Sequence, residues 1–124
     1  MSKTILNEVE INGITYVQKG TENSPAKKVD GLEYVLVRTR DAGVFAGYLS
    51  VKEFSEYELV NARRIWYWSG AASLSQLSID GTNDPDNCKF PEAVNKVTLF
   101  GVIEVLYPTE KARESIEGVK TWKA

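Results

Sequence analysis

The segment from Leu32 to Arg40 is apolar on both faces of an extended chain, and this feature constrains the fold most. Successive residues of a strand point to opposite faces of its sheet. A strand that is apolar on both faces has to be covered on both, so we expect it to be interior to a sheet. Only Asp41-Ala42-Gly43 separates it from a second strand, Val44 to Val51, and Tyr57 to Trp68 follows as a third. Strands joined by such short turns form a meander, which predicts an antiparallel sheet.

A hairpin precedes these strands. Asn12-Gly13 lies between the alternating segments Glu8 to Ile11 and Ile14 to Val17. Both central residues of a type I′ turn need positive φ, and Asn-Gly meets that need, so a hairpin is predicted. Residues 20–31 are predicted to be a loop, with Pro25 and several polar residues.

The C-terminal half is predicted to contain two helices and one further strand. Apolar residues recur from Ala71 to Leu77, which indicates a short helix that ends near Gly81. A polar loop from Gly81 to Pro91 and a strand from Val97 to Tyr107 follow.

The last helix is predicted to begin at Pro108-Thr109, because proline suits the first turn and threonine caps free amides. Ala112 and Ile116 would form its inner stripe and Gly118 would end it. We therefore predict one α+β domain over residues 1–124, with an antiparallel sheet of about five or six strands and two short helices. A long apolar sheet edge also favours an oligomer.

Composition limits the classes of function. The net charge is −2 with both signs interspersed, so no basic face for duplex nucleic acid is predicted. The single cysteine, Cys88, forms no internal disulfide, and no segment is long and apolar enough for a membrane span. We expect a cytoplasmic protein without a cofactor. The sequence contains no histidine, which rules out histidine-based nucleophile relays and imidazole zinc sites, so an enzyme is the less favoured interpretation.

Arg38 and Arg40 lie on one face of their strand and precede a turn of small residues. Guanidinium groups bind phosphate oxygens in a bidentate manner, and turn amides add fixed dipoles. The alternative is that these arginines pair with carboxylates such as that of Glu104 on a solvated sheet face. Spacing alone does not decide between the two.

Three consecutive aromatic residues follow in the third strand. Strand alternation would place Trp66 and Trp68 on one face and Tyr67 on the other. A flat aromatic surface can stack a nucleobase, and the small residues 69–71 after it would offer free amides at a helix start. A hydrophobic core or subunit contact is the alternative. The acidic loop 80–87 lacks the glycine and late glutamate of a calcium loop, so no metal is predicted.

Several motifs resemble those of the first-described Thoeris anti-defence family of phages and prophages. One runs from Asn61 to Leu77, and its most specific part is Trp66-Tyr67-Trp68 leading into Ser69-Gly70-Ala71-Ala72-Ser73-Leu74. Ala42-Gly43-Val44-Phe45-Ala46-Gly47, Cys88-Lys89-Phe90-Pro91 and the closing Ser115-Ile116-Glu117-Gly118-Val119 with Trp122 extend the resemblance. It runs from about Leu32 to the C-terminus.

The resemblance implies a protein that binds, without cleaving them, cyclic ADP-ribose isomers of the 1″–2′ or 1″–3′ glycocyclic type made by bacterial TIR-domain enzymes. It also implies a homo-oligomer, a dimer or hexamer, with pockets between subunits, and some members bind cyclic oligonucleotides too. Chemistry then suggests three groups of ligand-binding residues. They are the base-stacking Phe45, Trp66 and Trp68, the phosphate-binding Arg38, Arg40, Arg64 and Arg113, and the ribose-binding Ser69, Ser73 and Gln76.

Two other functions remain open from the sequence. The first is a structural phage protein whose aromatic residues only bury an oligomer interface. The second is a metal-dependent enzyme that degrades the nucleotide signal with carboxylates, which requires an acidic cluster beside the aromatic residues.

Overall fold

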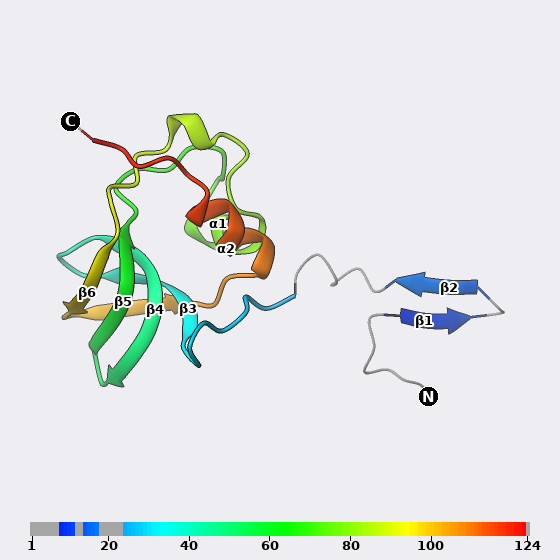
Figure 1. Ribbon diagram of the computed structural model, residues 1–124, viewed down its shortest axis with the longest axis horizontal. Coiled ribbons are helices and arrows are strands. Elements are labelled where there is room, and N and C mark those ends of the chain that lie inside the picture. Colours follow the sequence, from blue (N-terminus) through cyan, green and yellow to red (C-terminus); the bar gives the residue numbers. More distant parts are fainter. Residues whose placement is uncertain (1–7, 12–13, 18–23, 124) are drawn as a thin grey trace.

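The computed structural model describes residues 8–11, 14–17 and 24–123. Its elements in chain order are the strands β1 (Glu8–Ile11), β2 (Ile14–Val17), β3 (Glu33–Thr39), β4 (Val44–Glu53) and β5 (Glu56–Arg64), the helix α1 (Leu74–Asp80), the 3-10 helix η2 (Pro85–Asn87), the strands β6 (Val94–Leu99) and β7 (Val102–Leu106), and the helix α2 (Glu110–Glu117) (Figure 1). The predicted α+β class is confirmed.

The predicted N-terminal hairpin is present. β1 and β2 pair antiparallel, with Glu8 opposite Val17 and Ile11 opposite Ile14. The type I′ turn predicted at Asn12-Gly13 lies outside the described residues.

The main sheet has five antiparallel strands in the order β6-β5-β4-β3-β7. β3 lies between β4 and β7, so its predicted interior position is confirmed. Its four consecutive residues from Tyr34 to Val37 are all buried, as two apolar faces require. The meander runs from β3 to β6, and β7 returns to pair with β3.

The single late strand predicted from Val97 to Tyr107 is wrong. The chain turns at Phe100 and Gly101, where Gly101 has a φ of 70°, and it forms β6 and β7 on opposite edges of the sheet. Only two residues join these edges, so the sheet has to curl until they approach each other. The curled interior holds a cluster of side chains: Val35, Val37, Phe45, Leu59, Ala62 and Leu99, with Val97 and Val102 packed against them.

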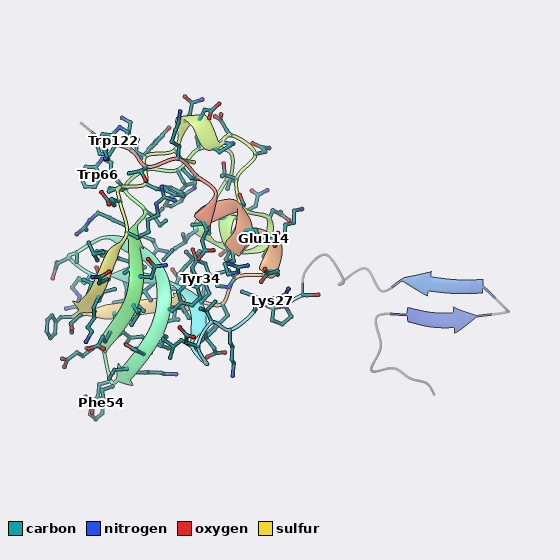
Figure 2. The ribbon with its side chains drawn as sticks, viewed as in Figure 1. Lys27, Tyr34, Phe54, Trp66, Glu114 and Trp122 are labelled. Carbon is teal, nitrogen blue, oxygen red and sulfur yellow. The ribbon has the colours of Figure 1, made fainter. Side chains whose placement is uncertain are left out.

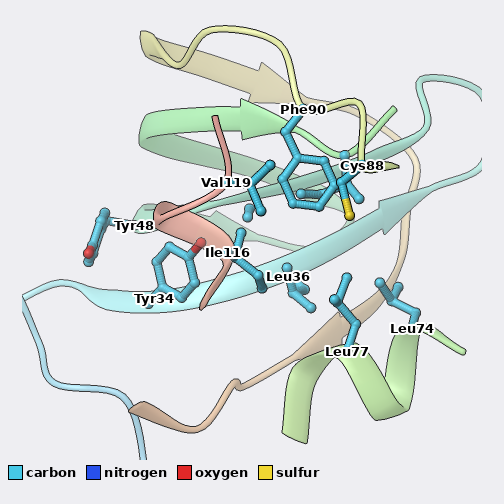
Figure 3. Close-up of a cluster of buried hydrophobic side chains, with 11 residues drawn as sticks. Tyr34, Leu36, Tyr48, Leu74, Leu77, Cys88, Phe90, Ile116 and Val119 are labelled. Carbon is cyan, nitrogen blue, oxygen red and sulfur yellow. The ribbon is translucent and has the colours of Figure 1, made fainter. Parts of the chain in front are cut away.

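The other face of the sheet is covered by the two helices. Tyr34 and Leu36 from β3 pack there with Leu77 from α1 and Ile116 from α2 (Figure 3). Phe90, which comes from the segment after η2, is fully buried in the same cluster. Figure 1 shows α1 and α2 side by side, and the two helices contact each other.

Both helices begin and end close to where the sequence predicts. The Thr109 side chain accepts a hydrogen bond from the Ala112 amide and caps α2. Gly81, with a φ of 74°, follows α1, and its amide donates to the Leu77 carbonyl. The segment after Gly81, predicted as a loop, includes the short 3-10 helix η2.

β5 ends at Arg64, so the predicted continuation of this strand to Trp68 is wrong. The neighbouring strand β4 begins at Val44, whose carbonyl accepts from the Ile65 amide, and it offers no partner beyond that point. The chain then leaves the sheet, and Tyr67 exchanges two backbone hydrogen bonds with Lys89, of 3.2 and 2.7 Å. Among the described residues no helix is long and apolar enough to cross a bilayer.

Candidate functional site

A pocket of about 370 Å³ lies where the chain leaves β5. Five residues line it, namely Trp66, Tyr67, Trp68, Ala71 and Ala72, and we call it the aromatic pocket. The segment lies outside β5, so the strand on which the sequence prediction places Tyr67 opposite the tryptophans ends before them. All three residues line this pocket.

The residues of the aromatic pocket differ in exposure to solvent. Trp66 is 64% exposed and Tyr67 is 52% exposed, so both present large apolar surfaces to solvent. Trp68 is half-buried against the cluster between the sheet and the two helices, and its Nε1 donates to the Ala71 carbonyl at 3.2 Å. The pocket thus combines one anchored ring with two exposed rings, an arrangement suited to stacking a flat ligand.

A lysine stands beside these rings. The Lys89 Nζ lies 5.8 Å from the centre of the Tyr67 ring and 5.6 Å from that of Trp122. Figure 2 shows Trp66 and Trp122 at the same end of the molecule. The sequence reasoning did not name Lys89 as a site residue, because nothing in the spacing reveals that it pairs with Tyr67.

The residues after Trp68 hold the pocket in place. Ser69 donates from its hydroxyl to Asp84 at 2.8 Å, and Asn87 donates to the same carboxylate. These bonds, that from Asn87 first, lower the pKa of Asp84. Gly70 has a φ of 86°, and a Cβ there would come within 2.5 Å of the Thr82 hydroxyl oxygen and 2.6 Å of the Asp84 amide. Only glycine fits this close approach, which fixes the chain between Trp68 and α1.

Ser73 and Gln76 are occupied by the cap of α1. The Ser73 hydroxyl accepts from the Gln76 amide at 3.1 Å, and the Gln76 side chain accepts from the Ala72 amide at 2.8 Å. The helix begins only at Leu74. The amides of Ala72 and Gln76 are therefore occupied by this cap. Residues 69–71, which the sequence predicts to offer free amides at a helix start, end three residues before the helix, and the Ser69 amide lies 3.4 Å from the Cys88 Sγ.

The predicted arginines do not converge on the aromatic pocket. Arg38 donates to Glu104 at 2.8 and 3.0 Å, which is the alternative that the sequence left open. Arg40 is exposed at the end of β3, where its backbone amide donates to the Gly101 carbonyl.

The other two arginines have partners elsewhere. Arg64 lies over the Phe45 ring at 4.3 Å and donates to the Ala42 carbonyl at 2.7 Å. Phe45 is only 4% exposed and belongs to the cluster inside the curled sheet, so it offers no free ring face for a base. Arg113 on α2 binds Glu110 and Glu117. Of the ten predicted ligand-binding residues, only Trp66 and Trp68 line the aromatic pocket.

Residues 32–116 match a protein family that is described as a domain of unknown function, DUF6948. The chain belongs to this family. No curated protein and no solved structure matches it. The matched residues include β3 to β7 and the whole aromatic pocket.

The lining of the aromatic pocket determines what kind of group it can bind. The side chains of its five lining residues carry no carboxylate, thiol or amine. Over the described part of the chain, no three Cys, Asp or Glu residues are placed to hold a metal ion. Such a surface binds flat, partly apolar groups, and Lys89 adds one positive charge at its edge.

Proposed function

We propose that this protein is a non-catalytic phage anti-defence protein that sequesters cyclic ADP-ribose isomers produced by TIR-domain enzymes. The observation that carries the proposal is the aromatic pocket. It lies in the Trp66 to Ser73 segment, which is also the most specific part of the resemblance to the Thoeris anti-defence family. Binding the signal without cleaving it would prevent activation of the downstream effector.

The ligand has an adenine ring, two riboses and a pyrophosphate, and the pocket suits the adenine. The base would stack on the exposed Trp66 ring and against the anchored Trp68. Stacking of this kind contributes about 1–3 kcal/mol per base. Lys89, whose Nζ lies 5.8 Å from the centre of the Tyr67 ring, would bind the pyrophosphate.

The volume of the pocket supports an oligomer as the binding form. At about 370 Å³ it lies near the small end of the ~300–1,000 Å³ typical of ligand pockets, enough for a base but open to solvent around the sugars and phosphates. A second copy of the chain would enclose the rest of the ligand and supply further donors. We therefore propose a homo-oligomer in the cytoplasm of the infected bacterium, with cyclic oligonucleotides as a second ligand class.

Ligand binding by a matched pair of variants tests the role of the pocket. Trp66→Ala removes an exposed ring from the pocket, and Phe54→Ala removes an exposed ring at the opposite end of the molecule (Figure 2). Loss of one stacked ring should weaken binding of cyclic ADP-ribose about 5- to 150-fold, measured by titration calorimetry. Phe54→Ala should bind as the wild type does.

Two results would contradict the proposal. Wild-type affinity in Trp66→Ala would remove the aromatic pocket as the binding site. No heat of binding in the wild type, together with dissociation of an oligomer in Trp66→Ala, would favour the structural alternative in which these rings bury a subunit contact.

A further inference from the structure

A second cavity, of about 450 Å³, lies between β4 and β5, the segment before β6 and the end of α2. We call it the Arg63 cavity. Its lining consists of Tyr34, Ala46, Asn61, Arg63, Glu92, Ala93, Glu117, Val119 and Thr121. It shares no residue with the aromatic pocket and contains none of the residues predicted from the sequence to bind a ligand.

Arg63 brings a buried positive charge to this cavity without an ion pair. Arg63 is 9% exposed, and its guanidinium donates to the backbone carbonyls of Phe90, Pro91 and Ile116, at 3.0 to 3.1 Å. Within the described ranges no carboxylate lies within 4.0 Å of it. A guanidinium has five N–H groups, so two remain without an acceptor among these residues. The guanidinium also lies 5.5 Å from the centre of the Phe90 ring. Buried charges are normally paired, so the two remaining N–H groups are suited to an acceptor that enters the cavity.

A second buried polar group in the cavity also lacks a partner. Tyr34 is 4% exposed, and its ring packs against Tyr48 at a centroid distance of 5.0 Å. The Tyr48 hydroxyl donates to Glu117 at 2.7 Å, whereas the Tyr34 hydroxyl makes no hydrogen bond to any residue that the structure describes. Burial raises the pKa of Tyr34, so the hydroxyl keeps its proton and is available as a donor.

The backbone of β5 is shaped to bring a further polar side chain to the cavity. Asn61 has a φ of 52°, and the pairing of β5 with β4 shifts register at this point. Left-handed backbone in a residue other than glycine stores strain and is typical of binding sites. A bulge of this kind re-aims the side chains beside it.

The charges around the cavity select the class of ligand. Glu92 and Glu117 line it together with the single positive charge of Arg63, and Glu117 is bound by Arg113. Glu92 repels any anion, but a phosphate ester, which carries close to two negative charges at neutral pH, would be repelled about twice as strongly as a singly charged carboxylate. A carboxylate carries one charge, and its two oxygens can accept from both Arg63 and Tyr34.

We propose that the Arg63 cavity binds the carboxylate of a small, singly charged molecule, with Arg63 and Tyr34 as its donors. Such a ligand would pair the buried guanidinium and satisfy the buried hydroxyl in one step. It would also bridge β5 to the C-terminal segment, because Val119 and Thr121 form one wall of the cavity. This proposal goes beyond nucleotide capture and stands independently of it, since the two sites have no residue in common.

The test is an NMR titration of the ¹⁵N-labelled full chain with acetate, propanoate and benzoate, and with phosphate and succinate as dianions. The monocarboxylates should shift the Arg63 Nε–H resonance in a saturable manner, and both dianions should bind more weakly. Tyr34→Phe removes only the unpartnered hydroxyl and should weaken monocarboxylate binding about tenfold. Tyr48→Phe is the matched control, because its hydroxyl already has Glu117 as a partner, and its affinity should equal that of the wild type.

Several outcomes would overturn the proposal. One is that none of the three monocarboxylates produces a saturable shift of Arg63. Another is that phosphate or succinate binds more tightly than all of them. Equal affinity in Tyr34→Phe and the wild type, or an equal loss in Tyr34→Phe and Tyr48→Phe, would show that the Tyr34 hydroxyl is not a ligand donor.

Discussion

Thr109 joins the two helices through a single hydroxyl group, and its replacement by alanine should be costly. The hydroxyl accepts from the Ala112 amide at 3.0 Å, which caps α2, and donates to the Ile79 carbonyl at 2.7 Å, near the end of α1. The residue is 8% exposed, so water does not replace either bond in the variant. Loss of the cap costs about 1 kcal/mol, the unsatisfied carbonyl costs about 1 kcal/mol more, and loss of the buried γ-methyl group adds about 1 kcal/mol.

Thr109→Ala should therefore lower the free energy of unfolding by about 3 kcal/mol, measured by urea denaturation followed by circular dichroism. For a domain of this size the melting temperature should fall by about 12 °C. Ser73→Ala removes a cap with one hydrogen bond at an exposed position and should cost about a third as much. Thr109→Ser keeps both bonds and loses one methyl group, at a cost of about 1 kcal/mol. The reasoning would be refuted by a Thr109→Ala variant no less stable than Ser73→Ala, or by equal losses in Thr109→Ala and Thr109→Ser.

Two further predictions concern stability. Gly81→Ala should cost about 3 kcal/mol or more in urea denaturation, because its Cβ would overlap the Ser115 side chain at a φ of 74°. Gly31→Ala, at a φ of 80° with no atom within 4 Å of the new Cβ, should cost only about 1 kcal/mol, and equal losses would contradict this account. Hydrogen bonds from Arg113 lower the pKa of Glu110 from its usual 4.5 to about 2. The ion pair of Glu110 with Arg113 stabilises the fold at pH values above the unfolded pKa of Glu110, and this stabilisation is lost as the pH falls toward 2. The free energy of unfolding should therefore fall less steeply with pH over that range in Glu110→Gln than in the wild type. An equal slope in both proteins would argue against this role of the pair.

The elements with strong local signals could be predicted from the sequence. β3 is apolar on both faces, which indicates an interior strand whatever its partners are. Thr109 and Gly81 are placed where helix caps require them, so the limits of α1 and α2 follow from local chemistry. The hairpin of β1 and β2 follows likewise from its turn residues.

The break between β6 and β7 could not be predicted, because the apolar alternation continues across it. Phe100 and Gly101 form no recognised turn signature, and β7 pairs with β3, which is distant in the sequence. The long-range partner, and not the local pattern, determines where the strand ends. The same holds for Trp68, since only the absence of a neighbouring strand beyond Val44 takes it out of the sheet.

The candidate site shows the same division between local and long-range information. Trp66 and Trp68 were predicted because three consecutive aromatic residues are a local signal. Lys89 was missed, since its place beside Tyr67 depends on backbone pairing between distant segments. Arg63 and Arg64 are adjacent, yet Arg63 is buried and Arg64 is exposed over the Phe45 ring. Strand alternation places the two side chains on opposite faces of the sheet but does not indicate which of them is buried.

Recovery of the intact ligand is the most direct test of the proposed sequestration. The protein would be incubated with cyclic ADP-ribose produced by a TIR-domain enzyme, passed through a filter and denatured by heat, and both fractions would be analysed by mass spectrometry. We predict that the signal disappears from the filtrate and returns chemically unchanged from the denatured protein. A new product in either fraction would make the protein an enzyme, and an undepleted filtrate would contradict nucleotide capture altogether.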